Sequence, residues 1–107
     1  MFINLTPHVI KVEDYTGNII SFEPTEPAAK IKVEQEFFET GNFRFSFTNF
    51  GEIENLPEPQ KHVIFITSLI VAQKAKRIDV VSPDIGPTAE RIDGQIDFVR
   101  GFVIHSK

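Results

Sequence analysis

The sequence has no cysteine and no tryptophan, and only one tyrosine and one methionine among its 107 residues. Without cysteine the chain has no disulfide framework, no thiolate nucleophile and no cysteine-ligated metal, which fits a reducing compartment. Its longest apolar run, around residues 68–72, is far shorter than the roughly 20 residues of a membrane span. The amino terminus lacks the pattern of a signal peptide. We therefore expect a soluble cytoplasmic protein with no membrane partner.

Positive charge is also scarce, because 15 acidic residues outnumber 11 basic ones and give a net charge of −4. Duplex nucleic acid usually binds to a positive surface, so this class of partner is disfavoured. What the chain does contain is phenylalanine, with 11 residues, within a hydrophobic fraction of 41%. A chain of this length and composition can bury one core without a metal or a disulfide. Residues 1–107 are expected to form a single domain, and no metal or cofactor is expected.

The first half of the chain has the pattern of antiparallel β-structure. Apolar residues around Val12 and Ile20 flank a polar stretch that contains Gly17, which predicts a hairpin with its loop at residues 14–18. Residues 31–34 alternate between apolar and polar side chains, as a half-buried strand does. The segment at 43–48 alternates more strictly and places three rings on one face, which we interpret as core packing: Phe43, Phe45 and Phe47.

A different pattern begins after the proline-rich segment at residues 54–60. Apolar runs at 62–67 and 77–81 predict strands that are buried on both faces. Helical spacing lies between them, which predicts a short helix from about Ser68 to Lys76 with Ser68 as its N-cap. Strand, helix and strand in this order predict a β-α-β crossover near residues 62–82, with parallel strands.

Asp93 and Gly94 follow and form the strongest hairpin signal in the chain. The fold class expected from these patterns is α+β. It combines a mixed, mainly antiparallel sheet with one short helix.

The segment at residues 80–91, VVSPDIGPTAER, is unusually rich in constrained and polar residues. If the crossover strands are parallel, Thr67 and Ser82 end at the same sheet edge, where ligands of α/β sheets collect. A helix amino terminus there would favour an anion. The loop is then expected to form the wall of a small-ligand site with Arg91 as charge partner. The candidate binding residues are Thr67, Ser68, Ser82, Asp84, Gly86, Thr88 and Arg91, with Arg100 and His8 as outer members.

The same residues also fit a purely structural role. Ser-Pro-Asp and Gly-Pro-Thr are common in turns, and the carboxylate of Asp84 can cap its own loop. Ser68 can be an N-cap and nothing more. The segment contains neither standard glycine-rich phosphate loop.

Catalytic patterns are weaker. His8, His62 and His105 are scattered without metal-ligand spacing. Ser68 or Ser82 could act as a nucleophile only if His8 or His105 lay beside it. No catalytic residue is assigned, and enzymatic activity is not the leading expectation.

Several motifs together resemble a family of small proteins encoded by bacteriophages, prophages and bacteria, for which no activity is established. They are INLTPHVIKV, FGEIENLPEPQ, VIFITSLIVAQKAK, RIDVVSPDIGPTAER and GQIDFVRGF. The resemblance spans most of the chain except residues 21–48, and members often have threonine at the position of Ile85. It transfers no functional residue.

The resemblance implies a phage-type accessory protein that interferes with host proteins or signalling molecules by binding. If a phage encodes the chain, the expected location is the host cytoplasm. The expected function is therefore non-catalytic binding of a small anionic ligand, such as a nucleotide. The second hypothesis is an interaction module whose phenylalanine-rich sheet edge pairs with another copy, as a homo-oligomer, or with a host protein. The third is a hydrolase of phosphoester or nucleotide bonds.

Overall fold

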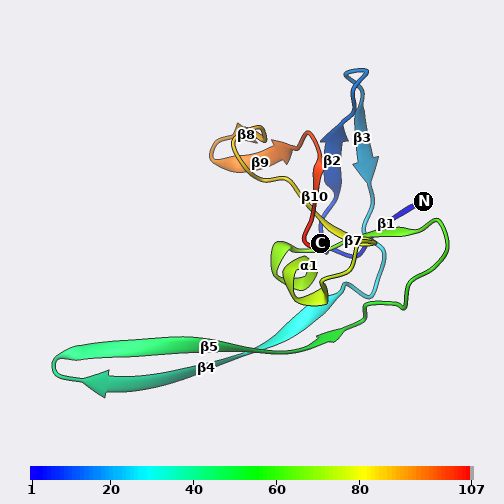
Figure 1. The fold of residues 1–107 in the computed structure, drawn as a ribbon. Coiled ribbons are helices and arrows are strands. Elements are labelled where there is room, and N and C mark those ends of the chain that lie inside the picture. Colours follow the sequence, from blue (N-terminus) through cyan, green and yellow to red (C-terminus); the bar gives the residue numbers. More distant parts are fainter. Residues whose placement is uncertain (107) are drawn as a thin grey trace.

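A central sheet organises the chain in the computed structural model, which describes residues 1–106 (Figure 1). The four strands lie in the order β1-β6-β7-β10. Their bounds are Phe2–Asn4, Ile64–Ile66, Val80–Pro83 and Phe102–Ile104. β1, β6 and β7 run parallel to one another, whereas β10 is antiparallel to β7. The expected fold class, α+β with a mixed and mainly antiparallel sheet arrangement, is confirmed.

The β-α-β crossover is present as the sequence predicts. Helix α1 (Leu69–Ala75) connects β6 to β7 and is seven residues long. It begins after Ser68, whose hydroxyl accepts a hydrogen bond from the backbone N–H of Val71 at 3.4 Å. It ends at Lys76, which has the left-handed conformation (φ 51°) that commonly closes a helix. Both expected helix ends are therefore confirmed.

Two short hairpins extend from the sheet. In the first, strands β2 (Ile10–Glu13) and β3 (Ile19–Phe22) enclose the expected loop at residues 14–18. In the second, β8 (Glu90–Ile92) and β9 (Gln95–Phe98) are joined by Asp93 and Gly94. Both of these turn residues have positive φ, as a type I′ turn requires.

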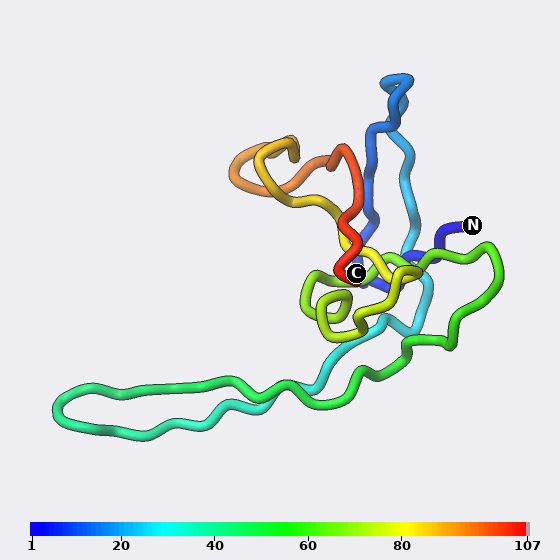
Figure 2. Tube along the Cα trace, in the orientation of Figure 1, coloured from blue at the N-terminus to red at the C-terminus, as the bar shows by residue number. Residues whose placement is uncertain are grey.

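The longest element is a hairpin that projects away from the rest of the molecule (Figure 2). Its strands are β4 (Lys30–Thr40) and β5 (Phe43–Glu54), which pair only with each other. We call this hairpin the arm. At its base, Ile31 and Ile53 pack against the core. Beyond them, every residue from 32 to 50 is exposed.

The buried hydrophobic residues form two small clusters beside the central sheet. One cluster joins the sheet to α1, and its members include Phe65, Val71, Ala72 and Val80. A second cluster, formed by Val12, Ala89 and Val99 with their neighbours, joins the two short hairpins to the sheet.

The interpretation of the phenylalanine stripe as core packing is wrong for the single chain. Phe43, Phe45 and Phe47 share one face of β5, as expected, but 71%, 44% and 47% of their surfaces remain exposed. The alternation correctly predicted a strand with one apolar face. It could not show that the arm extends beyond the core, so that nothing within residues 1–106 covers this face.

Candidate functional site

The carboxyl ends of β6 and β7 meet at one edge of the sheet. The backbone N–H of Thr67 donates to the carbonyl of Val81 at 2.8 Å, which holds Thr67 and Ser82 on neighbouring strands. The expected side-by-side placement of these residues is confirmed. Their side chains are not in solvent, however, because Thr67 is 0% and Ser82 is 1% exposed. The Thr67 hydroxyl donates to the carbonyl of Ser68 at 3.0 Å.

The loop after β1 covers this edge, and the buried side chain of Asn4 holds it in shape. The Asn4 amide donates to the carbonyls of His8 and Phe22 at 2.8 and 2.9 Å. Its oxygen accepts from the backbone N–H and the hydroxyl of Thr6 at 2.9 and 2.7 Å. Because all these groups are satisfied locally, the segment Thr6–His8 forms a rigid rim beside the ends of β6 and β7.

A recess of about 360 Å³ lies between this rim and the sheet edge, and we call it the edge recess. Five polar residues line it, and four of them are candidates from the sequence: Thr67, Ser68, Ser82 and His8, with Thr6 as the fifth. The remaining wall is largely apolar. It is lined by Thr6, Pro7, His8, Ile10, Thr67, Ser68, Leu69, Ser82, Pro83 and Ile85.

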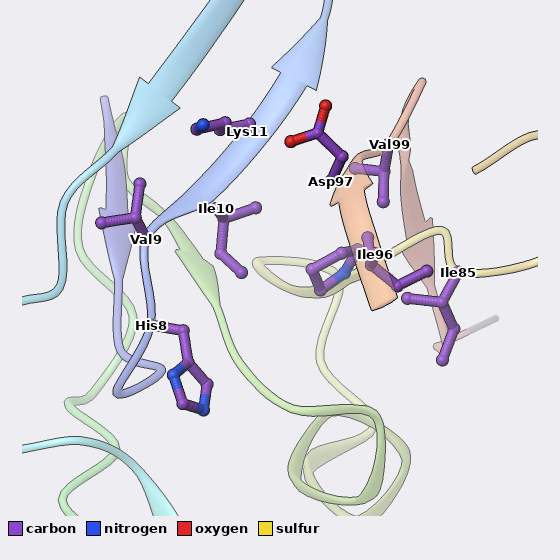
Figure 3. A pocket seen from close by; sticks show the side chains of 9 residues that line it. His8, Val9, Ile10, Lys11, Ile85, Ile96, Asp97 and Val99 are labelled. Carbon is purple, nitrogen blue, oxygen red and sulfur yellow. The ribbon is translucent and has the colours of Figure 1, made fainter. Parts of the chain in front are cut away.

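A second recess, of about 250 Å³, adjoins the first and extends toward the β2 and β9 hairpins; we call it the hairpin recess (Figure 3). His8, Ile10, Pro83 and Ile85 line both recesses. The hairpin recess adds Val9, Lys11, Ile96, Asp97 and Val99. In Figure 3, Ile10 of β2 and Ile96 of β9 face the recess from opposite sides. Lys11 and Asp97 bring one charge of each sign to its border.

The turn after β7 is held by its own side chains. The Asp84 carboxylate accepts the backbone N–H of Gly86 at 3.0 Å, so Asp84 does cap its own loop. A Cβ on Gly86 would lie 3.1 Å from this carboxylate oxygen, a close contact. Asp84, Gly86 and Thr88 line neither recess, whereas Pro83 and Ile85 of the same segment line both. The loop therefore contributes apolar wall residues instead of the polar ones that the sequence had proposed.

Neither candidate arginine lines a recess; both bind backbone carbonyls, and Arg100 also pairs with carboxylates. Arg91 donates to the carbonyls of Ile85 and Ala89 at 2.6 and 3.5 Å. Arg100 donates to the carbonyl of Thr88 and pairs with Glu90 at 2.8 Å and with Glu13 at 3.6 Å. These carboxylates raise the pKa of Arg100, with the Glu90 hydrogen bond as the main cause. Both arginines hold the β8-β9 hairpin in place and do not reach the recesses.

His105 is a site residue that the sequence analysis considered only conditionally. Its Nε2 lies 2.8 Å from the hydroxyl oxygen of Ser82. This meets the geometric condition under which Ser82 could be a nucleophile. The pair joins the carboxyl end of β7 to the segment after β10, and sequence spacing could not reveal it.

In the edge recess, sequence reasoning missed Thr6 and five apolar residues: Pro7, Ile10, Leu69, Pro83 and Ile85. In the hairpin recess it also missed the charged residues Lys11 and Asp97. Hydroxyl-bearing and charged residues are the features of a sequence that indicate an anion site, whereas prolines and aliphatic residues are typical of turns, helices and the core. The one available signal was Ile85, an apolar residue inside an otherwise polar turn.

Within residues 1–106, no group of histidine, aspartate and glutamate side chains is placed to hold a metal ion. No helix in this part of the chain is long and apolar enough to cross a membrane. In comparisons with family models, curated protein sequences and solved structures, nothing matches the chain.

Proposed function

We propose that the protein binds a small ligand without chemical turnover in the edge recess and the adjoining hairpin recess. The observation that carries this proposal is the edge recess itself. It collects residues from three separate segments of the chain at the carboxyl ends of two parallel strands. Its volume of about 360 Å³ falls within the range of small-molecule sites, which are mostly apolar with a few polar groups.

The chemistry of the two recesses supports a nucleotide-like ligand. The apolar wall of the edge recess would take a flat ring, with the hydroxyl of Ser68 and the His8 ring at its border. The hairpin recess adjoins it and supplies Lys11, which would attract a phosphate. Anion binding then depends on Lys11 and His8 and not on Arg91 or Arg100. In a phage-type protein, such binding would sequester a host signalling molecule.

Calorimetric titration with a nucleotide, the matching nucleoside and inorganic phosphate tests this function. We expect the nucleotide to bind, and a ligand at 100 times its dissociation constant to add about 2.7 kcal/mol to the free energy of unfolding. Replacing Ile85, which lines both recesses, by tryptophan should fill the space and weaken binding at least about 10-fold, a loss of about 1.4 kcal/mol. Ile78→Trp is the matched control, because Ile78 is 72% exposed and lines neither recess.

Lys11→Gln distinguishes binding of the ligand's anionic group from binding of its ring. It should weaken binding of the nucleotide and leave binding of the nucleoside unchanged. If Ile85→Trp and Ile78→Trp bind the nucleotide equally well, the ligand does not occupy these recesses and the proposal is wrong.

A second candidate function, hydrolysis, is favoured by the Ser82–His105 pair at 2.8 Å. Two observations place it behind binding. Ser82 is 1% exposed, and no hydrogen bond within residues 1–106 joins a carboxylate to His105. Turnover of nucleotides or activated esters that Ser82→Ala abolishes, while Ser21→Ala on the exposed strand β3 retains it, would reverse this order.

A further inference from the structure

The register of the arm separates its side chains into two faces. Residues that are paired across an antiparallel ladder lie on the same face. Phe38 pairs with Phe45, Glu36 with Phe47 and Thr40 with Phe43. One face of the arm therefore presents four rings, which we call the four-ring face: Phe38, Phe43, Phe45 and Phe47. The opposite face carries Val33, Phe37 and Phe50.

Three of the four rings are in contact, and Phe43 lies on the same face next to them in the ladder. Phe38 stacks on Phe45 with ring centroids 5.3 Å apart, and it contacts Phe47 at 6.1 Å. Their exposed fractions range from 44% for Phe45 to 71% for Phe43. Single exposed apolar residues are ordinary, but a contiguous cluster of this kind marks an interaction surface.

The arm has little of its own to keep it ordered. Residues 32–50 are all exposed, and the two strands have no further strand or helix against them beyond the base. An isolated two-stranded hairpin is at best marginally stable in water. Ordering each backbone residue costs about 1–2 kcal/mol, which burial of apolar surface normally offsets. The arm therefore needs a cover that this chain alone does not provide.

The dimensions of the molecule agree with an uncovered arm. The radius of gyration is 16.3 Å, and the longest extent is 57 Å. A compact domain of this length has a radius of gyration of about 13 Å. The arm accounts for the difference, since it is the part that projects from the body in Figure 2.

The area of the four-ring face matches what a dimer requires. With about 200 Å² for each phenylalanine ring, the exposed fractions give about 400 Å² for each chain and about 850 Å² for two. Interfaces are about 57–65% apolar, so this aromatic area corresponds to a total of about 1,300–1,500 Å². Stable protein–protein interfaces bury about 1,200–2,000 Å².

We propose that the four-ring face packs against the same face of a second copy of this chain, with the two arms antiparallel around a two-fold axis near Phe45. Glu36 lies on the same face as Phe47, toward the base of the arm. The antiparallel arrangement places this carboxylate opposite the tip of the other arm, where Thr40 and Phe43 lie. It therefore keeps the Glu36 side chains of the two copies apart.

A second copy fits this surface better than an unrelated protein. A partner that binds transiently needs a face that is stable in water when it is free, and such faces are about as polar as the rest of a protein surface. The interfaces of obligate homodimers instead resemble a core cut in half. Two-fold dimers, in which one patch meets itself, are also the commonest oligomers.

Sedimentation analysis of the full chain over a range of concentrations tests the proposal. The wild type should be a dimer. Phe45→Glu should raise the dimer dissociation constant at least about 30-fold, as loss of a hot-spot residue does. Tyr15→Glu is the matched control, since Tyr15 is a fully exposed aromatic residue on another hairpin, and it should leave the dimer intact. Circular dichroism establishes that each variant is folded.

A cross-linking experiment tests the geometry at protein concentrations high enough to keep the dimer despite loss of one ring. The chain has no cysteine, so a single introduced thiol is the only reactive one. Phe45→Cys lies near the proposed axis and should form a covalent dimer with a short bismaleimide, whereas Tyr15→Cys should not.

The outcomes that would overturn the proposal are clear. A wild-type chain that is monomeric at every concentration excludes it. So does a dimer that Phe45→Glu weakens no more than Tyr15→Glu, or a monomer whose four-ring face is covered by a different protein. None of these measurements involves the ligand recesses, so their result is independent of the proposed function.

Discussion

The side chain of Asn4 is buried, and it forms hydrogen bonds with three other residues at once. Its amide and its oxygen together make hydrogen bonds to His8, Phe22 and Thr6. The sequence showed only a short NLTPH segment beside a strand. The contacts explain the asparagine, because no other side chain of this size offers two donors and an acceptor in that arrangement.

Asn4→Ala should therefore destabilise the protein and open the edge recess. The substitution leaves buried donors and acceptors without partners, each at a cost of about 1–3 kcal/mol. We expect a loss of at least about 2 kcal/mol in the free energy of unfolding, measured with urea, together with weaker ligand binding. Asn18→Ala, at the exposed tip of the β2-β3 hairpin, is the control. Equal stability of the two variants would show that the Asn4 contacts are unimportant.

Arg77 and Asp79 form a pair that secures the start of β7. Arg77 donates to the two carboxylate oxygens of Asp79 at 2.9 and 2.6 Å, and to the carbonyl of Pro57 at 3.0 Å. Their side chains are 24% and 17% exposed, so solvent screens the pair only in part. The hydrogen bonds from Arg77 hold the pKa of the Asp79 carboxyl below its ordinary value.

This pKa shift predicts a pH dependence with a definite sign. Because the pKa of Asp79 is lower in the folded state, the pair stabilises the protein above the ordinary aspartate pKa of about 3.9. The contribution is lost as the pH falls through the lowered folded value. Asp79→Asn should cost about 1.5–3 kcal/mol at pH 7. Urea denaturation should show this difference from wild type shrinking below about pH 4. A difference that stays constant with pH would contradict the assignment.

At the scale of elements, helix α1 shows how one residue serves two roles. Ser68 caps the helix by accepting the N–H of Val71, and it also lines the edge recess. The helix is only seven residues long and has no acidic side chain in its first turn. The cap is therefore a substantial part of what starts it.

Two substitutions of Ser68 separate these roles. Ser68→Ala removes the cap and should cost about 1 kcal/mol of stability. Ser68→Asp keeps a capping oxygen and should retain stability, but it adds a negative charge to the recess and should weaken nucleotide binding more than nucleoside binding. Thermal denaturation and calorimetric titration measure the two effects. Equal nucleotide binding by Ser68→Asp and wild type would place the anion elsewhere.

The elements themselves were largely predictable from local sequence. The hairpin turn at Asp93 and Gly94, the helix ends at Ser68 and Lys76, and the parallel crossover are all as expected. Each depends on chemistry within a few residues, such as positive φ at a turn or a hydroxyl at a helix start. Arg100 could not be placed in this way, because one of its carboxylate partners, Glu13, lies 87 residues away in the chain. Arg91 binds carbonyls only two and six residues away, but local sequence did not indicate that these carbonyls would take its guanidinium.

At the scale of the whole molecule, the arm changes what the phenylalanine content implies about the core. The 11 phenylalanines suggested an apolar core, but the buried core is small and six of the rings lie on the arm. The folded chain therefore presents to solvent a surface that resembles an interior. In the proposed dimer this surface becomes an interface. The stability of the fold then depends on the protein concentration.

The sequence by itself determined the local elements: the α+β class, the two short hairpins, the capped helix and the parallel pair of strands after which Thr67 and Ser82 lie. These follow from periodicity and turn chemistry, which act over a few residues. Only the tertiary structure decided that Asn4 shapes the rim of the recess, that Ser82 meets His105, and that the phenylalanine stripe lies beyond the core. The physical reason is that burial and partnership depend on which distant segments meet, and a strand with an apolar face has the same sequence pattern whether or not the chain covers it.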